Sequence, residues 1–200
     1  LSILTFSISS ILICSFAWGG AINTSPEVTS AALWIILFFA SVLTFTTSFT
    51  REKDRGTLGG LKTLPCSAAS ILFGKILYAT VLLLLVESVM LPFSIVFLNL
   101  ELPGGILDFL VIFVLGIIDL SVAGSFVSGL VMFSEGKTLL LSFLLFPVCV
   151  PVLIPSVLAT TKIMNPVILT DVMPELRLLF AFLLCIIAVT NLTFEFVLEE

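Results

Sequence analysis

Two carboxylates lie within long apolar stretches of this 200-residue sequence. Glu87 occurs in the run from 70 to 98, and Asp119 in the run from 106 to 133. Ionisable groups at such positions are costly in a membrane, so each is a candidate to line a polar path or to move a proton. No Lys, Arg or His lies at comparable depth to pair with them. That absence favours the alternative that each is protonated or hydrogen-bonded between helices.

A fragment of a nucleotide-binding motif, SEGKT, occupies residues 134–138. A complete Walker A loop needs Gly five residues before Gly136, where this chain has Val131, and it must follow a strand. Here the fragment lies between two apolar runs, so we interpret it as a tight turn. The chain is therefore predicted to be non-catalytic, and any ATP hydrolysis is assigned to a partner chain.

A charged segment from Arg51 to Arg55 interrupts the apolar sequence. Its five residues alternate in sign and sum to only +1, which suits a solvated, partner-facing segment better than a lipid-binding patch. Leucines then recur at every third position, the spacing of one face of a short helix: Leu58, Leu61 and Leu64. The alternative is a solvated loop lying on the membrane surface.

The elements that position these residues follow from composition. With 60% hydrophobic and 10% charged residues, and a mean hydropathy of +1.32, the chain differs from soluble domains, which are about 25% charged. Runs long enough to cross a bilayer as helices predict an all-α integral membrane protein of one domain over 1–200. Its six predicted spans are 1–18, 29–49, 70–98, 106–133, 138–160 and 176–197, with a loop at 50–69. A net charge of −5 argues against a nucleic-acid partner.

Counting positive charges orients the chain, because loops rich in Lys and Arg stay in the cytoplasm. Placing the 50–69 loop inside puts six there against two outside: Arg51, Lys53, Arg55, Lys62, Lys75 and Lys137 against Lys162 and Arg177. Both termini are then predicted to be cytoplasmic. Trp18 and Trp34 fall near the outer ends of their spans, as interfacial aromatic residues do. The chain starts at Leu1 inside an apolar run, so we expect an N-terminal segment to be missing.

Two spans carry features of packing or bending. The fourth has small residues that allow close helix approach, namely Gly116, Ser121, Gly124, Ser125, Ser128 and Gly129. The fifth has prolines four residues apart, which fall on nearly one face and remove backbone hydrogen bonds: Pro147, Pro151 and Pro155. A bent or interrupted helix is expected there, either as a hinge at a transport site or as ordinary packing.

Two separated blocks resemble the cytochrome c maturation B proteins, the CcmB or heme exporter protein B family. The first is LWIILFFASVLTFTTSFTREKDRGTLGGLKTLPCSAASILFGKIL, residues 33–77, and it matches through Trp34, Phe49, Glu52, Gly56, Thr57, Leu58, Leu61, Pro65 and Lys75. The second is LLLSFLLFPVCVPVLIPS, residues 139–156, and it matches through Pro147, Pro151, Leu153 and Ile154. The six-span layout agrees over nearly the whole chain.

The resemblance implies an ABC-2-type permease subunit of the inner membrane, with two copies per transporter and a separate CcmA-like ATPase on the cytoplasmic side. The loop after the second span would then carry a coupling helix that contacts this ATPase, through Arg51, Glu52, Gly56, Leu58, Leu61 and Leu64. The resemblance further implies CcmC-like and CcmE-like partners that handle heme, with ATP turnover coupled to heme delivery or to release of the heme chaperone.

Heme itself is not expected to be held by this chain alone. The sequence has no His, Tyr78 is its single Tyr, and its four Cys form no CxxC pair, so the usual axial ligands and attachment motifs are missing. The four Met are interpreted as core residues. Two other functions stay open: an ABC-2-type permease for a different substrate, and an ion-coupled carrier or scaffold without an ATPase that uses Glu87 and Asp119.

Overall fold

The computed structural model describes residues 2–18, 25–54, 68–100, 105–131, 136–165 and 169–199. Within these ranges the chain is helical: α1 (Ser2–Ala17), α2 (Pro26–Asp54), α4 (Ala68–Phe97), α5 (Ile106–Val131), α6 (Lys137–Ile163), the short 3-10 helix η1 (Leu169–Val172) and α7 (Met173–Glu199). The predicted all-α class is confirmed. The predicted helix ends lie within three residues of the observed ones, except that α2 ends five residues later.

Five of the described helices are long and apolar enough to cross a membrane, namely α2, α4, α5, α6 and α7. The first helix is shorter, with 16 residues and a length of about 24 Å at 1.5 Å per residue, against a hydrocarbon core of about 30 Å. The first predicted span, 1–18, is therefore an apolar helix that does not reach spanning length within the described residues. The protein is a multi-pass membrane protein.

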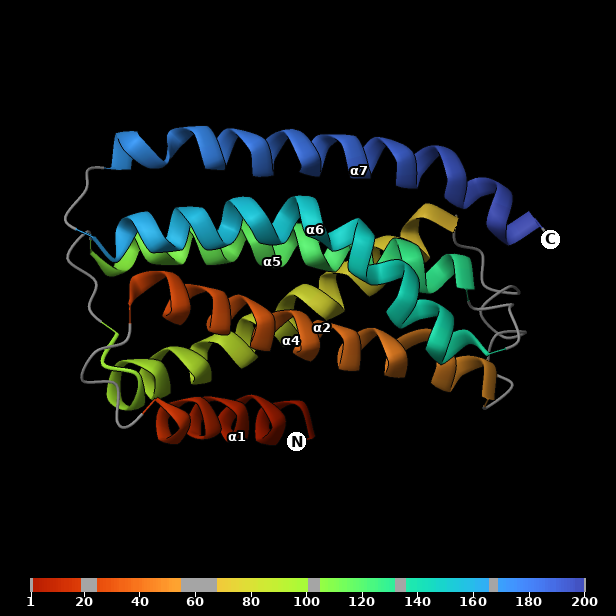
Figure 1. Ribbon diagram of the computed structural model, residues 1–200. Helices are drawn as coiled ribbons and strands as arrows, with labels where there is room; N and C mark the ends of the chain where they lie inside the picture. The colour runs from red at the N-terminus through yellow and green to blue at the C-terminus, as the bar shows by residue number, and fades with distance from the viewer. Residues whose placement is uncertain are drawn as a thin grey trace.

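The helices alternate in direction, so that their ends gather at two opposite ends of the bundle (Figure 1). The carboxyl ends of α2 and α7 and the amino end of α1 all point toward one of these ends (Figure 1). The connection between α6 and α7 lies at the other. Gly136, with a φ of 72°, immediately precedes α6 and forms part of the turn predicted for the SEGKT fragment.

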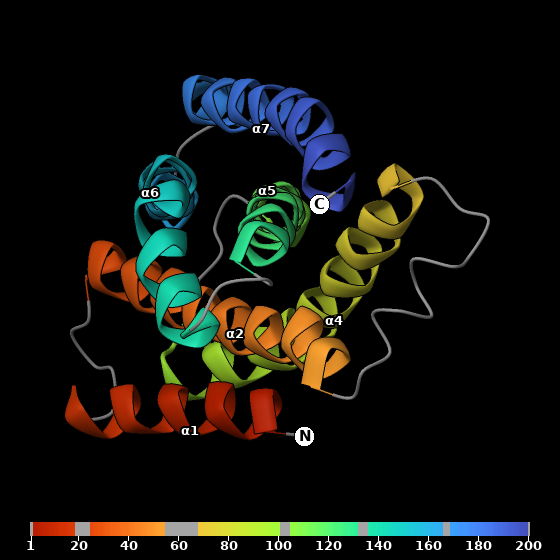
Figure 2. The same ribbon diagram turned by 90° about the vertical axis from the view of Figure 1, so that its right-hand side faces the viewer.

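Helix α5 lies at the centre of the bundle (Figure 2). It contacts α2, α4, α6 and α7, whereas α1 contacts only α2 and α4 among the closely packed helices and lies at the edge. Membrane spans with small residues can approach closely because little side chain separates the backbones, and α5 has such residues on several sides. Of the span in α5, 56% is buried, compared with 17% of that in α7. The predicted packing role of the small residues in α5 thus coincides with the central position.

Candidate functional site

The charged segment begins inside a helix. Helix α2 continues through Arg51, Glu52 and Lys53 and ends at Asp54, so the predicted start of a loop at residue 50 is wrong. The physical reason is local: charged residues such as Arg, Glu and Lys are good helix formers, and no Gly or Pro occurs before Gly56. The remaining predicted contact residues, Gly56, Leu58, Leu61 and Leu64, lie outside the described residues.

Trp34 connects α2 to both α5 and α6. Its side chain is fully buried, and its ring stacks on Phe113 of α5 with centroids 4.6 Å apart. The indole Nε1 donates a hydrogen bond to Thr160 Oγ1 of α6 at 2.9 Å, and Thr160 in turn donates to the carbonyl of Ser156 at 2.8 Å. The Trp34 ring therefore does not behave as an interfacial side chain that faces headgroups, because its polar N–H has a partner inside the bundle.

Two glycines of α5 make room for aromatic rings of α2. A Cβ atom on Gly116 would lie 2.8 Å from Trp34 Cζ3, and a Cβ on Gly124 would overlap the ring of Phe45. Ser128 also donates to the carbonyl of Phe45 at 3.3 Å. Since only glycine leaves this space, the close approach of α2 and α5 depends on these two positions.

A second polar contact ties the first turns of α2 to α6. The hydroxyls of Ser30 and Thr161 share a short hydrogen bond. Ser30 lies about one helical turn before Trp34 on α2, and Thr161 follows Thr160 on α6. We call these contacts, made by Ser30, Trp34, Thr160 and Thr161, the α2–α6 polar seam. Sequence reasoning did not identify it. The available signal was the presence of Ser30, Thr160 and Thr161 in otherwise apolar spans.

The three prolines lie within one continuous α-helix, α6. The expected interruption is therefore absent, whereas Figure 1 shows α6 to be bent, with its first part turned away from the direction of its second. A proline removes one backbone hydrogen bond and crowds the preceding turn, which bends a helix without ending it when neighbours support it. Pro147 also lines an apolar groove of about 550 Å³ between α2 and α6. Helix α4 contains a further internal proline, Pro92, that sequence analysis did not single out.

Glu87 and Asp119 are both buried, at 5% and 0% exposure, on the neighbouring helices α4 and α5. Neither oxygen of Asp119 has a hydrogen-bond partner among the described residues, and Glu87 Oε2 has none either. The two carboxylates are thus not hydrogen-bonded to each other. Asp119 is on α5, which packs against the proline-containing helix α6.

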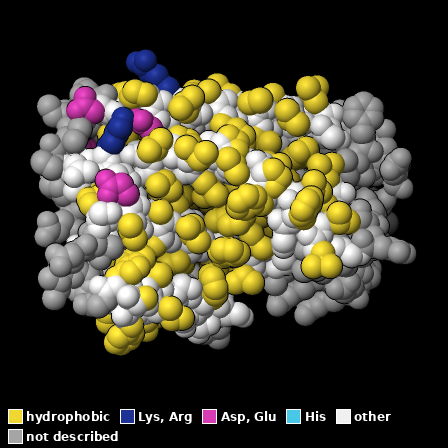
Figure 3. All heavy atoms as spheres, viewed as in Figure 1, with side chains coloured by type: hydrophobic (Ala, Val, Ile, Leu, Met, Phe, Trp, Pro, Cys, Tyr) yellow, Lys and Arg dark blue, Asp and Glu magenta, His cyan; other side chains and the backbone are white. Residues whose placement is uncertain are grey.

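Charged side chains on the visible face gather at the end where α6 meets α7, beside an apolar middle (Figure 3). There Lys162 Nζ forms an ion pair with Glu175 at 2.8 Å and donates to the carbonyl of Asp171 at 2.9 Å. These residues were predicted to share the outer side. In the structure they lie at the opposite end from Arg51 and Glu52.

The described residues contain no group of three or more Cys, Asp or Glu side chains that could hold a metal ion. The part of the chain that the structure describes offers two buried carboxylates, a bent helix and an aromatic connection between three helices. Close packing of this kind can transmit movement from one helix to its neighbours.

Comparison with known proteins identifies the family. A family model described as CcmB protein matches residues 1–199. No curated protein and no solved structure matches the chain. The match covers both blocks on which the sequence resemblance rests, together with all the described helices, and it confirms that resemblance. The chain therefore belongs to the CcmB protein family, the membrane permease subunits of heme exporters that serve cytochrome c maturation.

Proposed function

We propose that this permease couples ATP hydrolysis in a separate CcmA-like ATPase to heme delivery or to release of a heme chaperone, and that the end of α2 and the loop after it receive the ATPase. Two copies of the chain would face two ATPase subunits on the cytoplasmic side of the inner membrane. CcmC-like and CcmE-like proteins would hold the heme, because this sequence has no His and no CxxC pair.

The observation that supports the proposal is the continuity of α2. Its 29 residues extend about 44 Å at 1.5 Å per residue, which exceeds the hydrocarbon core by roughly 14 Å. The segment Arg51–Asp54 belongs to the same continuous helix as Ser30 and Trp34. A force applied to the charged end does not have to cross a loop before it reaches the membrane.

The packing of α2 indicates which neighbouring helices such a force would move. Trp34 and Phe45 fill the recesses of α5 at Gly116 and Gly124, and the α2–α6 polar seam joins α2 to α6. Packed interfaces of this kind move as units, since side chains that interdigitate cannot slide continuously. A displacement of α2 would therefore carry α5 and the bent helix α6 with it.

The test uses the intact complex with variants at both predicted contact positions, Glu52→Lys and Leu61→Asp. The expected result is loss of the ATPase from the purified complex, by about tenfold or more if these residues act as interface anchors, with a parallel fall in holo-cytochrome c. Asp171→Lys is the matched control: it makes the same charge reversal at the opposite end, where the Asp171 side chain is exposed.

One observation supports an ion-coupled carrier as the second candidate. Glu87 and Asp119 are buried, and neither Glu87 Oε2 nor the two carboxylate oxygens of Asp119 have a hydrogen-bond partner among the described residues. If the ATPase stays bound in Glu52→Lys and Leu61→Asp while Glu87→Gln abolishes holo-cytochrome c, the coupling proposal fails and the carrier explains the data. Loss of the ATPase in the two coupling variants, with Asp171→Lys unaffected, supports the proposal.

A further inference from the structure

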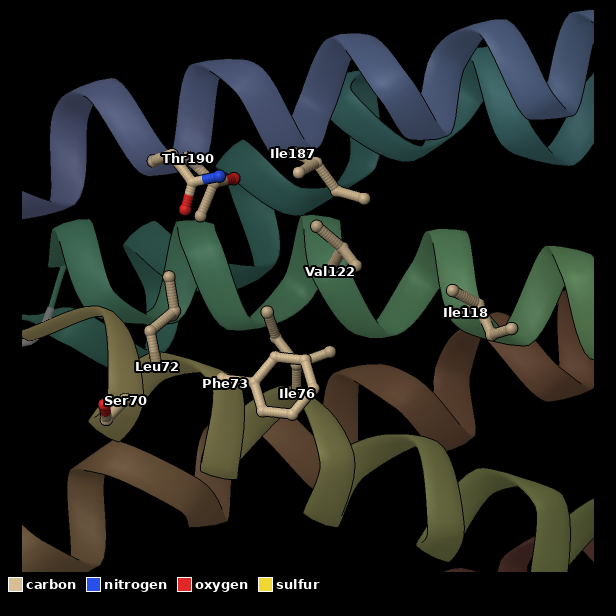
Figure 4. A pocket seen from close by; sticks show the side chains of 9 residues that line it. Ser70, Leu72, Phe73, Ile76, Ile118, Val122, Ile187 and Thr190 are labelled. Carbon is tan, nitrogen blue, oxygen red and sulfur yellow. The ribbon is translucent and has the colours of Figure 1, made fainter.

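A groove of about 620 Å³ opens between α4, α5 and α7. Its walls are mainly apolar, with Phe73 and Ile76 from α4, Val122 from α5 and Ile187 from α7, and its polar groups include Thr190 and Asn191 of α7 (Figure 4). The volume falls within the range of about 300–1,000 Å³ that is typical of small-molecule sites. Nothing in the proposed coupling role uses this groove.

The groove lies at the depth where an amphipathic molecule would reside. Ser70 lies in the first turn of α4, and Thr190 and Asn191 lie among the last ten residues of α7, whereas Val122 lies deeper, toward the middle of α5. Phe73 is 67% exposed, and α7 is the least buried of the spanning helices. The groove is therefore open to the hydrocarbon of the bilayer, with Thr190 and Asn191 near the membrane boundary.

Among the residues that line the groove, Thr190 has a buried hydroxyl without a hydrogen-bond partner in the described part of the chain. Its side chain is 3% exposed, yet its Oγ1 has no hydrogen-bond partner among the described residues. Thr193, three residues further along α7, instead donates to the carbonyl of Val189 at 2.8 Å, and Thr80 of α4 makes the corresponding bond to Ile76. Figure 4 shows Thr190 and Ile187 projecting from α7 toward α5. A buried hydroxyl without a partner is costly, and an acceptor on a bound molecule would remove that cost.

We propose that this groove binds one acyl chain of a membrane phospholipid, with the ester carbonyl of that chain accepting a hydrogen bond from Thr190. The lining residues are Ser, Leu, Phe, Ile, Val, Thr and Asn. They include no usual iron ligand for a porphyrin and no cation for its carboxylates. An acyl chain needs neither, and it matches an apolar groove with polar groups near its boundary end.

The hydrogen bond and the shape of the groove determine the affinity, because apolar walls gain nothing over the surrounding lipid tails. Removing the bond by Thr190→Val, which keeps the side-chain shape, should weaken binding by about 2- to 10-fold. Filling the groove by Val122→Phe should abolish it. Matched controls are Thr193→Val, whose hydroxyl already has a partner, and Val111→Phe, on an exposed position of α5.

The experiment uses the intact complex in nanodiscs that contain a phosphatidylethanolamine with a diazirine in the middle of one acyl chain. After photolysis, the labelled peptides are mapped by mass spectrometry. We expect label concentrated on residues near Phe73, Val122 and Ile187, reduced by Thr190→Val, lost in Val122→Phe and unchanged in both controls.

Three results would overturn the proposal. Label spread evenly over the exposed faces of all spans, and insensitive to Val122→Phe, would indicate bulk lipid only. Label displaced by hemin, but not by excess unlabelled phosphatidylethanolamine, would indicate a porphyrin site. Equal labelling in Thr190→Val and wild type would refute the role assigned to the hydroxyl. ATPase retention by the variants is measured alongside, so that failure of the lipid site remains distinct from failure of the coupling proposal.

Discussion

Replacing Gly116 by Ala tests the packing between α2 and α5 directly. The added methyl would lie 2.8 Å from Trp34 Cζ3 and 3.1 Å from Ser156 Oγ, whereas carbon atoms in contact prefer about 3.5–4.0 Å. Trp34 has little freedom to move, because it is fully buried, stacked on Phe113 and hydrogen-bonded to Thr160. The ring must therefore shift against well-packed neighbours.

The size of the effect follows from two opposing contributions. Ala in place of Gly favours a helix interior by about 1 kcal/mol, and overpacking a filled core costs about 1–3 kcal/mol. At Gly74 of α4 a new Cβ would meet no atom within 4 Å, so only the favourable contribution remains. The two variants should thus differ in free energy of unfolding by about 1–3 kcal/mol, with Gly74→Ala the more stable.

The assay is reversible unfolding of the purified chain in mixed detergent micelles with increasing SDS, followed by circular dichroism. A double-mutant cycle completes it: in a Trp34→Phe background the shorter ring leaves room for the methyl, so the penalty of Gly116→Ala should largely disappear. If Gly116→Ala stabilises the chain as much as Gly74→Ala does, Trp34 does not pack on Gly116 and the argument that α2 and α5 move together is refuted.

Three further predictions use the same assay. Thr160→Val should destabilise the chain by about 1–3 kcal/mol, because the buried indole N–H of Trp34 loses its acceptor; no change would mean that the indole has another partner. Asp119→Leu should stabilise it, since both carboxylate oxygens lack partners, and a large loss of stability would show that the carboxylate is engaged. Lys162→Gln should cost less than about 1 kcal/mol, because the Lys162 side chain is 39% exposed; an effect above 2 kcal/mol, or one insensitive to salt, would contradict that estimate.

Local patterns predicted the helices well, because a backbone in hydrocarbon has few alternatives to the helix. The end of α2 was missed for a related reason. Hydropathy marks where a span leaves the membrane, whereas helix formation depends on local propensity. The segment Arg51–Asp54 is too polar to count as part of the span, but its residues still continue the helix. For α6, the proline spacing predicted the bend but could not tell a bend from a break, which depends on the neighbouring helices.

Local sequence patterns could not predict which residues surround a given side chain in the folded protein. Trp34 looked interfacial because tryptophans near span ends usually are, and only the positions of Thr160 and Phe113, 126 and 79 residues away in sequence, show that it is buried. Likewise, the small residues of α5 suggested close packing, but not that Gly116 and Gly124 would receive two rings from α2.

The sequence by itself determined the class of protein, the approximate spans and the family. Its apolar composition shows that the chain resides in a membrane, and the two family blocks can be read directly from the order of residues. The tertiary structure decided which polar groups obtain partners. Hydrogen bonds and steric recesses depend on distances between residues far apart in the chain: Trp34 obtains one from Thr160, whereas Thr190 and Asp119 obtain none among the described residues. Those differences are the basis of both proposals, the coupling through α2 and the lipid groove.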